Sequence, residues 1–400
     1  MSRVSKAEQF LFYCLCGFAF TLPISKAVGN LFLSLSLILF FYRIYFKHDD
    51  IQKIFFANKN IFAVIGLLFG AVLISAFSSE EFLTGLKSWL NKYFFHASII
   101  LPIIFITHNK EKIFSIFKFL LLGCVINYSA VIVHALLHFP LTVTPRFGGL
   151  LGPMQEASLL VMTLPIFLLI FLHAKDGQFK IFSAILFLVG MIALLLNGTR
   201  GAWLAALILL PLTVLIYSKN IKKSLIAIFT ALVLVSGIFF INSILSSRLA
   251  TITDLKMQSN SERLLMWKSA WNMFKDNPIL GVGYGQYKTA YQTKYILPEA
   301  KERELGHAHS NFFQILGECG FLGFSAFIFM WIYFSYFAIK KWRREKNFAC
   351  LMFFCVLWGF MLHGFTEFNF ETSVPSKLFW LSLALCVAYI NDSKNFFHRI

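Results

Sequence analysis

Three arginines lie in segments that separate the long apolar runs of this 400-residue chain. Arg146 stands in the glycine-rich link 144–152, Arg200 in the hairpin 197–203, and Arg263 near the start of an amphipathic stretch. A guanidinium binds phosphate oxygens bidentately and stays charged at any relevant pH. Arginines at a membrane boundary therefore suit the diphosphate of a lipid carrier. The alternative is that each arginine extends toward lipid headgroups.

Two histidines, His307 and His309, precede an apolar run that begins at Asn311. Histidine is the usual general base near neutral pH, because its unperturbed pKa is roughly 6.5. Glu318 follows Asn311 by seven residues and so shares its helical face, and an intramembrane carboxylate is a functional candidate. The alternatives are a solvated pair of histidines and a buried carboxyl group bonded to a neighbouring helix.

Two pairs with a spacing of four residues could hold a metal ion or relay protons, namely His134 with His138 and His363 with Glu367. Neither pair has an evident third ligand in the sequence. We therefore expect no metal site and no cofactor.

The elements that must position these residues are membrane-spanning helices. The chain is 58% hydrophobic, 18% aromatic and only 14% charged, against roughly a quarter charged for an ordinary soluble domain. So much apolar surface must face lipid or other helices, which excludes a soluble globule. A span needs about 20 mostly apolar residues, and about twelve runs qualify. They predict an all-α polytopic membrane protein with spans at 9–26, 28–46, 60–78, 85–107, 114–138, 157–173, 180–196, 201–217, 224–245, 311–339, 348–366 and 375–391.

The net charge of +17 comes largely from Lys and Arg in alternate loops, most densely at 340–346. Since cationic loops stay in the cytoplasm, this distribution predicts that both termini are cytoplasmic. The chain is therefore predicted to have three parts: spans one to nine in 1–245, a long outer loop in 246–310, and spans ten to twelve with a short cytoplasmic tail in 311–400. The charge is therefore topological, and we expect no nucleic-acid partner.

The outer loop contains a predicted amphipathic helix. Ser259 and Glu262 have the spacing of a capping box. Apolar residues then follow at helical spacing until Pro278: Leu264, Trp267, Trp271 and Phe274. We expect this helix to lie on the outer membrane surface or over a cavity. The glycine run 281–285 predicts a turn, because no βαβ unit surrounds it.

The stretch 262–324 resembles the O-antigen ligase family. The resemblance rests on the arginine-bearing amphipathic helix and on segments 277–283, 307–311 and 317–323. The sequence Asn-Gly-Thr-Arg-Gly-Ala-Trp around Arg200 resembles the arginine hairpin of that family. Segment 364–367, Gly-Phe-Thr-Glu, resembles its trailing motif. O-antigen polymerases and bacterial protein O-oligosaccharyltransferases share these patterns.

The resemblance implies a GT-C-like, metal-independent glycosyltransferase at the periplasmic face of the bacterial inner membrane. It would move a glycan from undecaprenyl diphosphate to an acceptor hydroxyl. Matching positions imply that Arg200 and Arg263 hold the diphosphate and that His309 acts on the acceptor hydroxyl. Further substrate-binding candidates are Arg146, His307, Asn311, Glu318 and Glu367.

One position departs from the family pattern. Relatives often have His followed directly by Asn, whereas here Ser310 separates His309 from Asn311. The choice between His307 and His309 is therefore open, and we favour His309 because it lies nearer the helix.

The resemblance leaves three functions to weigh. The first is a ligase that joins a carrier-linked polysaccharide to a lipid A-core sugar. It is favoured because related protein O-glycosyltransferases tend to be longer than this chain. The second is a polysaccharide polymerase or a protein O-oligosaccharyltransferase. The third is a transporter of lipid-linked glycans, which should have charges deep in several spans or internal repeats. The polar candidates instead gather at one face, which favours catalysis. The expected partners are the carrier-linked glycan, the lipid A-core acceptor and the bilayer.

Overall fold

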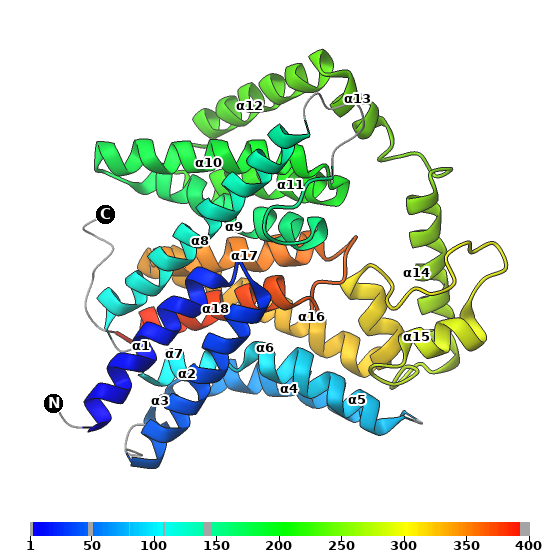
Figure 1. The fold of residues 1–400 in the computed structure, drawn as a ribbon, viewed down its shortest axis with the longest axis horizontal. Helices are drawn as coiled ribbons and strands as arrows, with labels where there is room; N and C mark the ends of the chain where they lie inside the picture. The colour runs from blue at the N-terminus through cyan, green and yellow to red at the C-terminus, as the bar shows by residue number, and fades with distance from the viewer. Residues whose placement is uncertain (1–2, 47–50, 80, 107–108, 139–145, 393–400) are drawn as a thin grey trace.

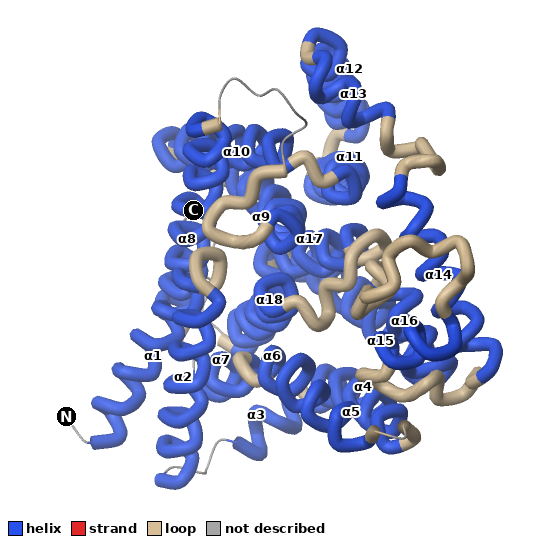
Figure 2. Tube along the Cα trace, turned by 45° about the vertical axis from the view of Figure 1, so that its right-hand side comes forward, coloured by secondary structure: helices blue, strands red, loops and turns tan. Residues whose placement is uncertain are grey.

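The computed structural model describes residues 3–46, 51–79, 81–106, 109–138 and 146–392. Every regular element in these ranges is a helix (Figure 1, Figure 2). The helices are α1 (Arg3–Thr21), α2 (Lys26–Phe46), α3 (Ile51–Ala57), α4 (Lys59–Phe77), α5 (Phe82–Ser88), the π-helix η1 (Trp89–Phe94), α6 (Phe95–Ala97), α7 (Ile100–Ile106), α8 (Lys110–Leu137), α9 (Pro153–His173), α10 (Gly177–Asn197), α11 (Arg200–Tyr217), α12 (Ile221–Ile241), α13 (Ser243–Ala250), α14 (Gln258–Asp276), α15 (Tyr287–Ala290), the π-helix η2 (Tyr291–Tyr295), α16 (Asn311–Glu345), α17 (Phe348–His363) and α18 (Ser373–Asn391).

Nine helices among the described residues are long and apolar enough to cross a membrane: α2, α4, α8, α9, α10, α11, α12, α16 and α18. Each coincides closely with a predicted apolar run. Helix α17 also matches its run but has only 16 residues. Helix α1 ends at Thr21 and so covers only 9–21 of the predicted run 9–26. The all-α polytopic class is thus confirmed, whereas the count of twelve spans is not.

The predicted span 85–107 is wrong as a single helix, because this stretch is divided among α5, η1, α6 and α7. The last break lies at Ser98 and Ile99. Pro102 follows four residues after Ser98, and a proline within a helix removes a hydrogen bond and clashes with the carbonyl group four residues earlier. Lys92 forms an ion pair with Glu371, which gives an ammonium group in this apolar stretch an anionic partner.

Helices α9, α17 and α18 form the centre of the bundle, and most of their side chains are buried. A Cβ at Gly359 of α17 would lie 2.9 Å from the Cα of Met162 in α9, so the glycine lets the two backbones approach closely. Helix α12 is the opposite case, since most of its side chains are exposed and apolar. Such a surface suits lipid.

Helix α14 lies across the end of the bundle at the right of Figure 1, at a steep angle to the long helices. Trp267 fastens it there. Its indole ring stacks on Phe313 of α16 with centroids 5.1 Å apart, and its Nε1 donates to the carbonyl oxygen of Ala308 at 3.0 Å. The amphipathic helix predicted for this segment therefore lies over the start of α16.

One detail predicted for α14 is wrong. The carboxylate of Glu262 does not close a capping box. It accepts hydrogen bonds from the backbone N–H groups of Lys301 and Glu302 at 3.0 and 3.2 Å, and so ties a distant loop to α14. Leu264 and Trp271, two of the apolar residues at helical spacing, are about half exposed. The buried side chains are Glu262, Met266, Ser269, Ala270 and Met273.

Candidate active site

A cavity of about 380 Å³ opens at the end of the bundle that α14 covers. Arg146, Arg200, Arg248 and Arg263 line it, and we call it the arginine cavity. These residues come from the link before α9, the start of α11, helix α13 and helix α14. Glu302, His363 and Glu367 also line the cavity. Four guanidinium groups give it a positive potential that attracts anions.

Arg200 reaches the cavity through a tight hairpin. Gly198 ends α10 in the left-handed conformation at φ 65°, which closes the helix without strain. Arg200 then begins α11 and is only 8% exposed. Its terminal nitrogens contact the carbonyl oxygen of Thr251 at 2.5 Å, Met257 Sδ at 2.9 Å, Ser259 Oγ at 2.8 Å and Asn260 Oδ1 at 2.9 Å. Four of its five N–H donors are therefore engaged within the chain, and Arg200 fastens the segment before α14 to the hairpin.

Arg263 lies in the second turn of α14 and has no hydrogen-bond or ion-pair partner among the described residues. Burial lowers the pKa of its guanidinium, Glu367 opposes this effect, and the charge of Arg146 adds to it. Arg263 is therefore a charged donor group open to a ligand. Arg146 is exposed and contacts Met154 Sδ at 3.8 Å.

Arg248 was missed by the sequence analysis. Its Nε donates to the carbonyl oxygen of Gly198 at 3.1 Å, which draws α13 to the arginine hairpin. Burial lowers its pKa, and the charges of Arg146 and Arg263 lower it further. An anion in the cavity would relieve this mutual repulsion. The available signal was weak, because Arg248 is one basic residue in a long polar segment with no motif around it.

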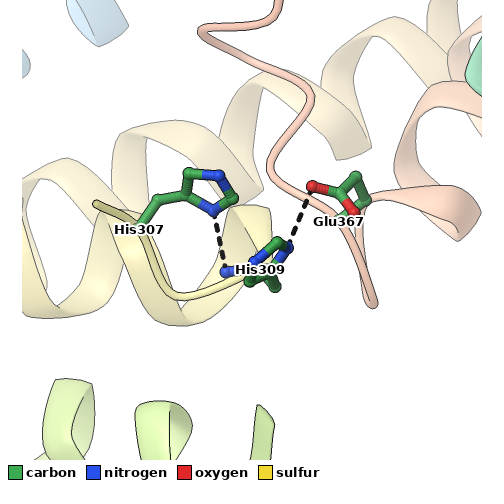
Figure 3. A group of neighbouring side chains, drawn as sticks. All are labelled: His307, His309 and Glu367. Atoms are coloured by element: carbon green, nitrogen blue, oxygen red, sulfur yellow. Dashed lines mark hydrogen bonds and ion pairs between the residues drawn. The ribbon is translucent and has the colours of Figure 1, made fainter. Parts of the chain in front are cut away.

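His309, His307 and Glu367 lie together (Figure 3), and Glu367 also lines the arginine cavity. His309 Nδ1 is 3.1 Å from Glu367 Oε1. The backbone N–H of His309 donates to His307 Nδ1 at 3.2 Å. His309 has a φ of 47°, a left-handed conformation that non-glycine residues adopt infrequently. The chain therefore bends sharply at His309, immediately before α16.

The charges of this group differ between its members. Burial favours a neutral Glu367, but its hydrogen bond with His309 and the nearby histidines outweigh burial and lower its pKa to about 2. Burial lowers the pKa of His307 to about 4, and the neighbouring His309 adds to that effect. Near neutral pH, Glu367 is therefore a carboxylate and His307 is uncharged.

Asn311 joins the start of α16, next to His309, to the loop that bears Glu367. It is fully buried at the start of α16, and its N–H donates to the carbonyl oxygen of Gly364 at 2.7 Å. Its Oδ1 accepts from the backbone N–H groups of Asn369 and Phe370 at 2.8 and 3.3 Å. These bonds hold the loop that bears Glu367 against the start of α16. Asn311 is not among the residues that line the arginine cavity.

Glu318 also lies away from the cavity lining. It is 2% exposed, and its Oε1 accepts from the backbone N–H of Tyr287 at 2.9 Å. Its carbonyl oxygen accepts from Gly283 at 3.0 Å. A Cβ at Gly281 would lie 2.3 Å from that same oxygen, so the predicted glycine turn packs directly on α16. The surroundings of Glu318 resemble the structural alternative, because its partner Tyr287 is the first residue of the short helix α15.

The two histidine pairs differ in position. His134 and His138 do not line the arginine cavity, and His134 Nδ1 lies 3.0 Å from the carbonyl oxygen of Gly148. His363 does line it. Its Nδ1 is 2.9 Å from Ser158 Oγ, whereas its buried Nε2 has no hydrogen-bond partner among the described residues.

One group of side chains has the geometry to hold a metal ion. The candidate ligand atoms of His307, His309 and Glu367 all lie within 4.8 Å of one another. Two imidazoles and a carboxylate suit a divalent transition metal such as zinc. The expectation of a metal-free site therefore stays a prediction.

The described residues thus form a polytopic membrane protein with a positively charged cavity and a histidine–carboxylate pair at one end of the bundle. Residues 182–328 match the family model described as O-Antigen ligase, which confirms the resemblance. The matched region contains Arg200, Arg248, Arg263 and His309. The chain is also similar to the ComP-specific O-oligosaccharyltransferase of Acinetobacter baylyi, with 25% identity over 251 residues. That alignment covers 61% of this chain and 44% of the relative, so the chain spans less than half of the relative's length.

Proposed function

We propose that this protein transfers a glycan from an undecaprenyl-diphosphate carrier to an acceptor hydroxyl. The reaction takes place at the periplasmic face of the bacterial inner membrane, with both termini in the cytoplasm. The observation that supports this most strongly is the convergence of four arginines from separate segments beside the His309–Glu367 pair. The similarity to the O-antigen ligase family supports the same reaction class.

The arginines divide the work of holding the diphosphate. Arg263 and Arg146 have donors open to phosphate oxygens, whereas the donors of Arg200 are largely engaged within the chain. Arg200 and Arg248 therefore contribute fixed charge and hold the cavity walls in place. Preorganised positive charge stabilises the negative charge that develops on the leaving diphosphate.

His309 acts as the general base. The Glu367 carboxylate accepts from Nδ1–H, so the lone pair of the neutral imidazole is on Nε2. The acceptor oxygen attacks the anomeric carbon and its proton passes to Nε2. The bond from that carbon to the diphosphate oxygen breaks, and the electron pair leaves on the carrier diphosphate. His307 is a weak base near neutral pH, because burial lowers its pKa to about 4.

The leading acceptor is a sugar hydroxyl of lipid A-core, which makes the protein a lipopolysaccharide ligase. A second candidate is a hydroxyl group on a protein. The similarity to an O-oligosaccharyltransferase is the observation that supports this alternative.

Deletion of the gene, followed by analysis of the carrier-linked glycan, tests the proposal. Accumulation of full-length carrier-linked chains with bare lipid A-core indicates a ligase, and accumulation of single repeat units indicates a polymerase. Loss of glycan confined to glycoproteins indicates the protein acceptor. Glycan retained on the cytoplasmic side indicates a transporter and overturns the proposed reaction, as does normal glycosylation of every acceptor.

A further inference from the structure

A second cavity, of about 750 Å³, lies at the opposite end of the bundle from the arginines. It is formed by the ends of α9, α11, α16 and α18 and by the starts of α8, α12 and α17. Four lysines line it, and we call it the lysine cavity: Lys110, Lys219, Lys223 and Lys346. The helix ends that form it are those that the loop charges predict to be cytoplasmic.

The charge balance of the lysine cavity is positive. Its lining includes two carboxylates, Glu345 and Asp392. Glu345 pairs at 2.6 Å with Lys341, which is outside the lining. No ion pair joins Lys219, Lys223 or Lys346 to a carboxylate in the part of the chain that the structure describes. These ammonium groups can therefore bind an external anion.

The wall of the lysine cavity is aromatic. Tyr217 stacks on Trp342 with centroids 6.0 Å apart, and Trp342 Nε1 donates to the carbonyl oxygen of Ile216 at 3.4 Å. The Lys346 ammonium lies over the Trp342 ring at 5.4 Å. Tyr and Trp side chains with this placement are typical of the depth at which lipid headgroups meet acyl chains.

An apolar slot continues from the lysine cavity toward the bilayer centre. It encloses about 200 Å³ between α8, α9, α10 and α17 and shares His173 and Phe348 with the cavity. The rings of these two residues stack at 4.3 Å and form the boundary between slot and cavity. Its lining is otherwise apolar except for Lys118. A cationic chamber joined to an apolar slot has the two-part shape of an amphiphile.

We propose that the lysine cavity and its slot bind one anionic phospholipid from the leaflet at this end of the bundle. The lysines neutralise the headgroup phosphate, and an acyl chain enters the slot beyond His173 and Phe348. A soluble anion would use the lysines alone and would leave the slot unexplained. This inference does not depend on the proposed glycan transfer, because it rests on the opposite end of the bundle.

The test uses the full-length protein in nanodiscs that contain phosphatidylglycerol and phosphatidylcholine. The protein is released into detergent, and native mass spectrometry counts the retained phosphatidylglycerol. The test variant is Lys223→Gln with Lys346→Gln. The matched control, Lys222→Gln with Lys340→Gln, removes two lysines at the same end that do not line the cavity. Since each lysine near an anionic lipid contributes about fivefold to binding, the test variant should bind about 25-fold more weakly and the control within twofold of wild type.

Further variants and competing ligands separate the roles of charge, folding and the acyl chain. Lys223→Arg with Lys346→Arg keeps the charge and should retain the lipid, and Lys219→Gln alone should bind about fivefold more weakly if the double variant fails to fold. Dihexanoyl phosphatidylglycerol should displace the retained lipid less well than the long-chain form, because its chains are too short to fill the slot. Glycerol phosphate should not displace it. Displacement by glycerol phosphate, or equal losses in test and control variants, would overturn the proposal.

Discussion

The two ends of the bundle both present positive cavities, but they use different residues in different ways. The arginine cavity is about half the volume of the lysine cavity. Its guanidinium groups come from separate segments, and two of them are bonded to the backbone of a neighbouring segment. Arginine offers a planar, always charged fork, whereas lysine offers a mobile point charge. Fixed forks suit a leaving diphosphate, and mobile ammonium groups suit a headgroup that must only be neutralised.

Among the charged residues of the two cavities, Arg263 should cause the largest loss of glycan transfer when it is removed. Arg263→Ala should reduce glycan transfer by roughly a hundredfold or more, because one preorganised donor to the developing charge is lost. The measurement is the transfer rate of purified protein with a lipid-diphosphate-linked glycan. Arg303→Ala is the matched control, since Arg303 is exposed in the same segment and does not line the cavity. An equal loss in Lys223→Gln would remove the distinction between the two ends.

The histidine–carboxylate pair lies at the arginine end of the bundle. His309→Ala should lower the rate by roughly a hundredfold or more, the usual range for a general base. Glu367→Gln should lower it by about tenfold to a hundredfold, because Glu367 orients the base through its hydrogen bond with Nδ1. The same assay measures both variants, with protein abundance as control. A normal rate in His309→Ala together with a large loss in His307→Ala would transfer the base to His307.

Substitutions at Arg200 and Arg263 should have different effects on protease sensitivity. Arg200→Ala removes two contacts to the segment between α13 and α14 and two to the first turn of α14, so that segment should be cleaved about tenfold faster in limited proteolysis. Arg263 makes no such contacts, and Arg263→Ala should be cleaved at the wild-type rate. Equal cleavage of the two variants would contradict the division of roles between these arginines.

His307 should make the protein less stable in acid. Its pKa is about 4 in the folded protein and roughly 6.5 in an unfolded chain. Between these values the unfolded chain binds a proton that the folded protein does not, so stability falls as the pH is lowered from about 6.5 to 4, by at most about 3 kcal/mol. Between pH 7 and pH 4.5, the thermal unfolding midpoint of His307→Gln should fall less than that of the wild-type protein. An unchanged loss would show that His307 is not buried in its neutral form.

A chelator should have the smallest effect. If arginines alone neutralise the diphosphate, transfer in EDTA should stay within about twofold of the untreated rate, because no step needs a bound cation. Activity that is lost in EDTA and restored by one divalent metal would instead assign a metal to His307, His309 and Glu367.

Local patterns in the sequence predicted most of the fold. Helices α8, α9, α10 and α11 coincide with apolar runs, because a segment of about 20 apolar residues in lipid must satisfy its own backbone as a helix. The same patterns failed at 85–107, where Lys92 pairs with Glu371 nearly three hundred residues later. They failed again at Glu262, whose backbone partners lie about forty residues away. A local pattern has no information about partners at that distance.

For the candidate site, the sequence predicted residue types but not their contacts. The residue types of Arg200, Arg263 and His309, and their places at helix boundaries, indicated phosphate binding and proton transfer before any geometry was known. Packing decided which donors are engaged, and so separated Arg200 from Arg263 and brought Arg248 to the same cavity. The sequence by itself determined the helices and the chemical types at their ends, because both depend on nearby residues. The tertiary structure alone decided which of these types meet, because hydrogen bonds and burial depend on segments that are distant along the chain.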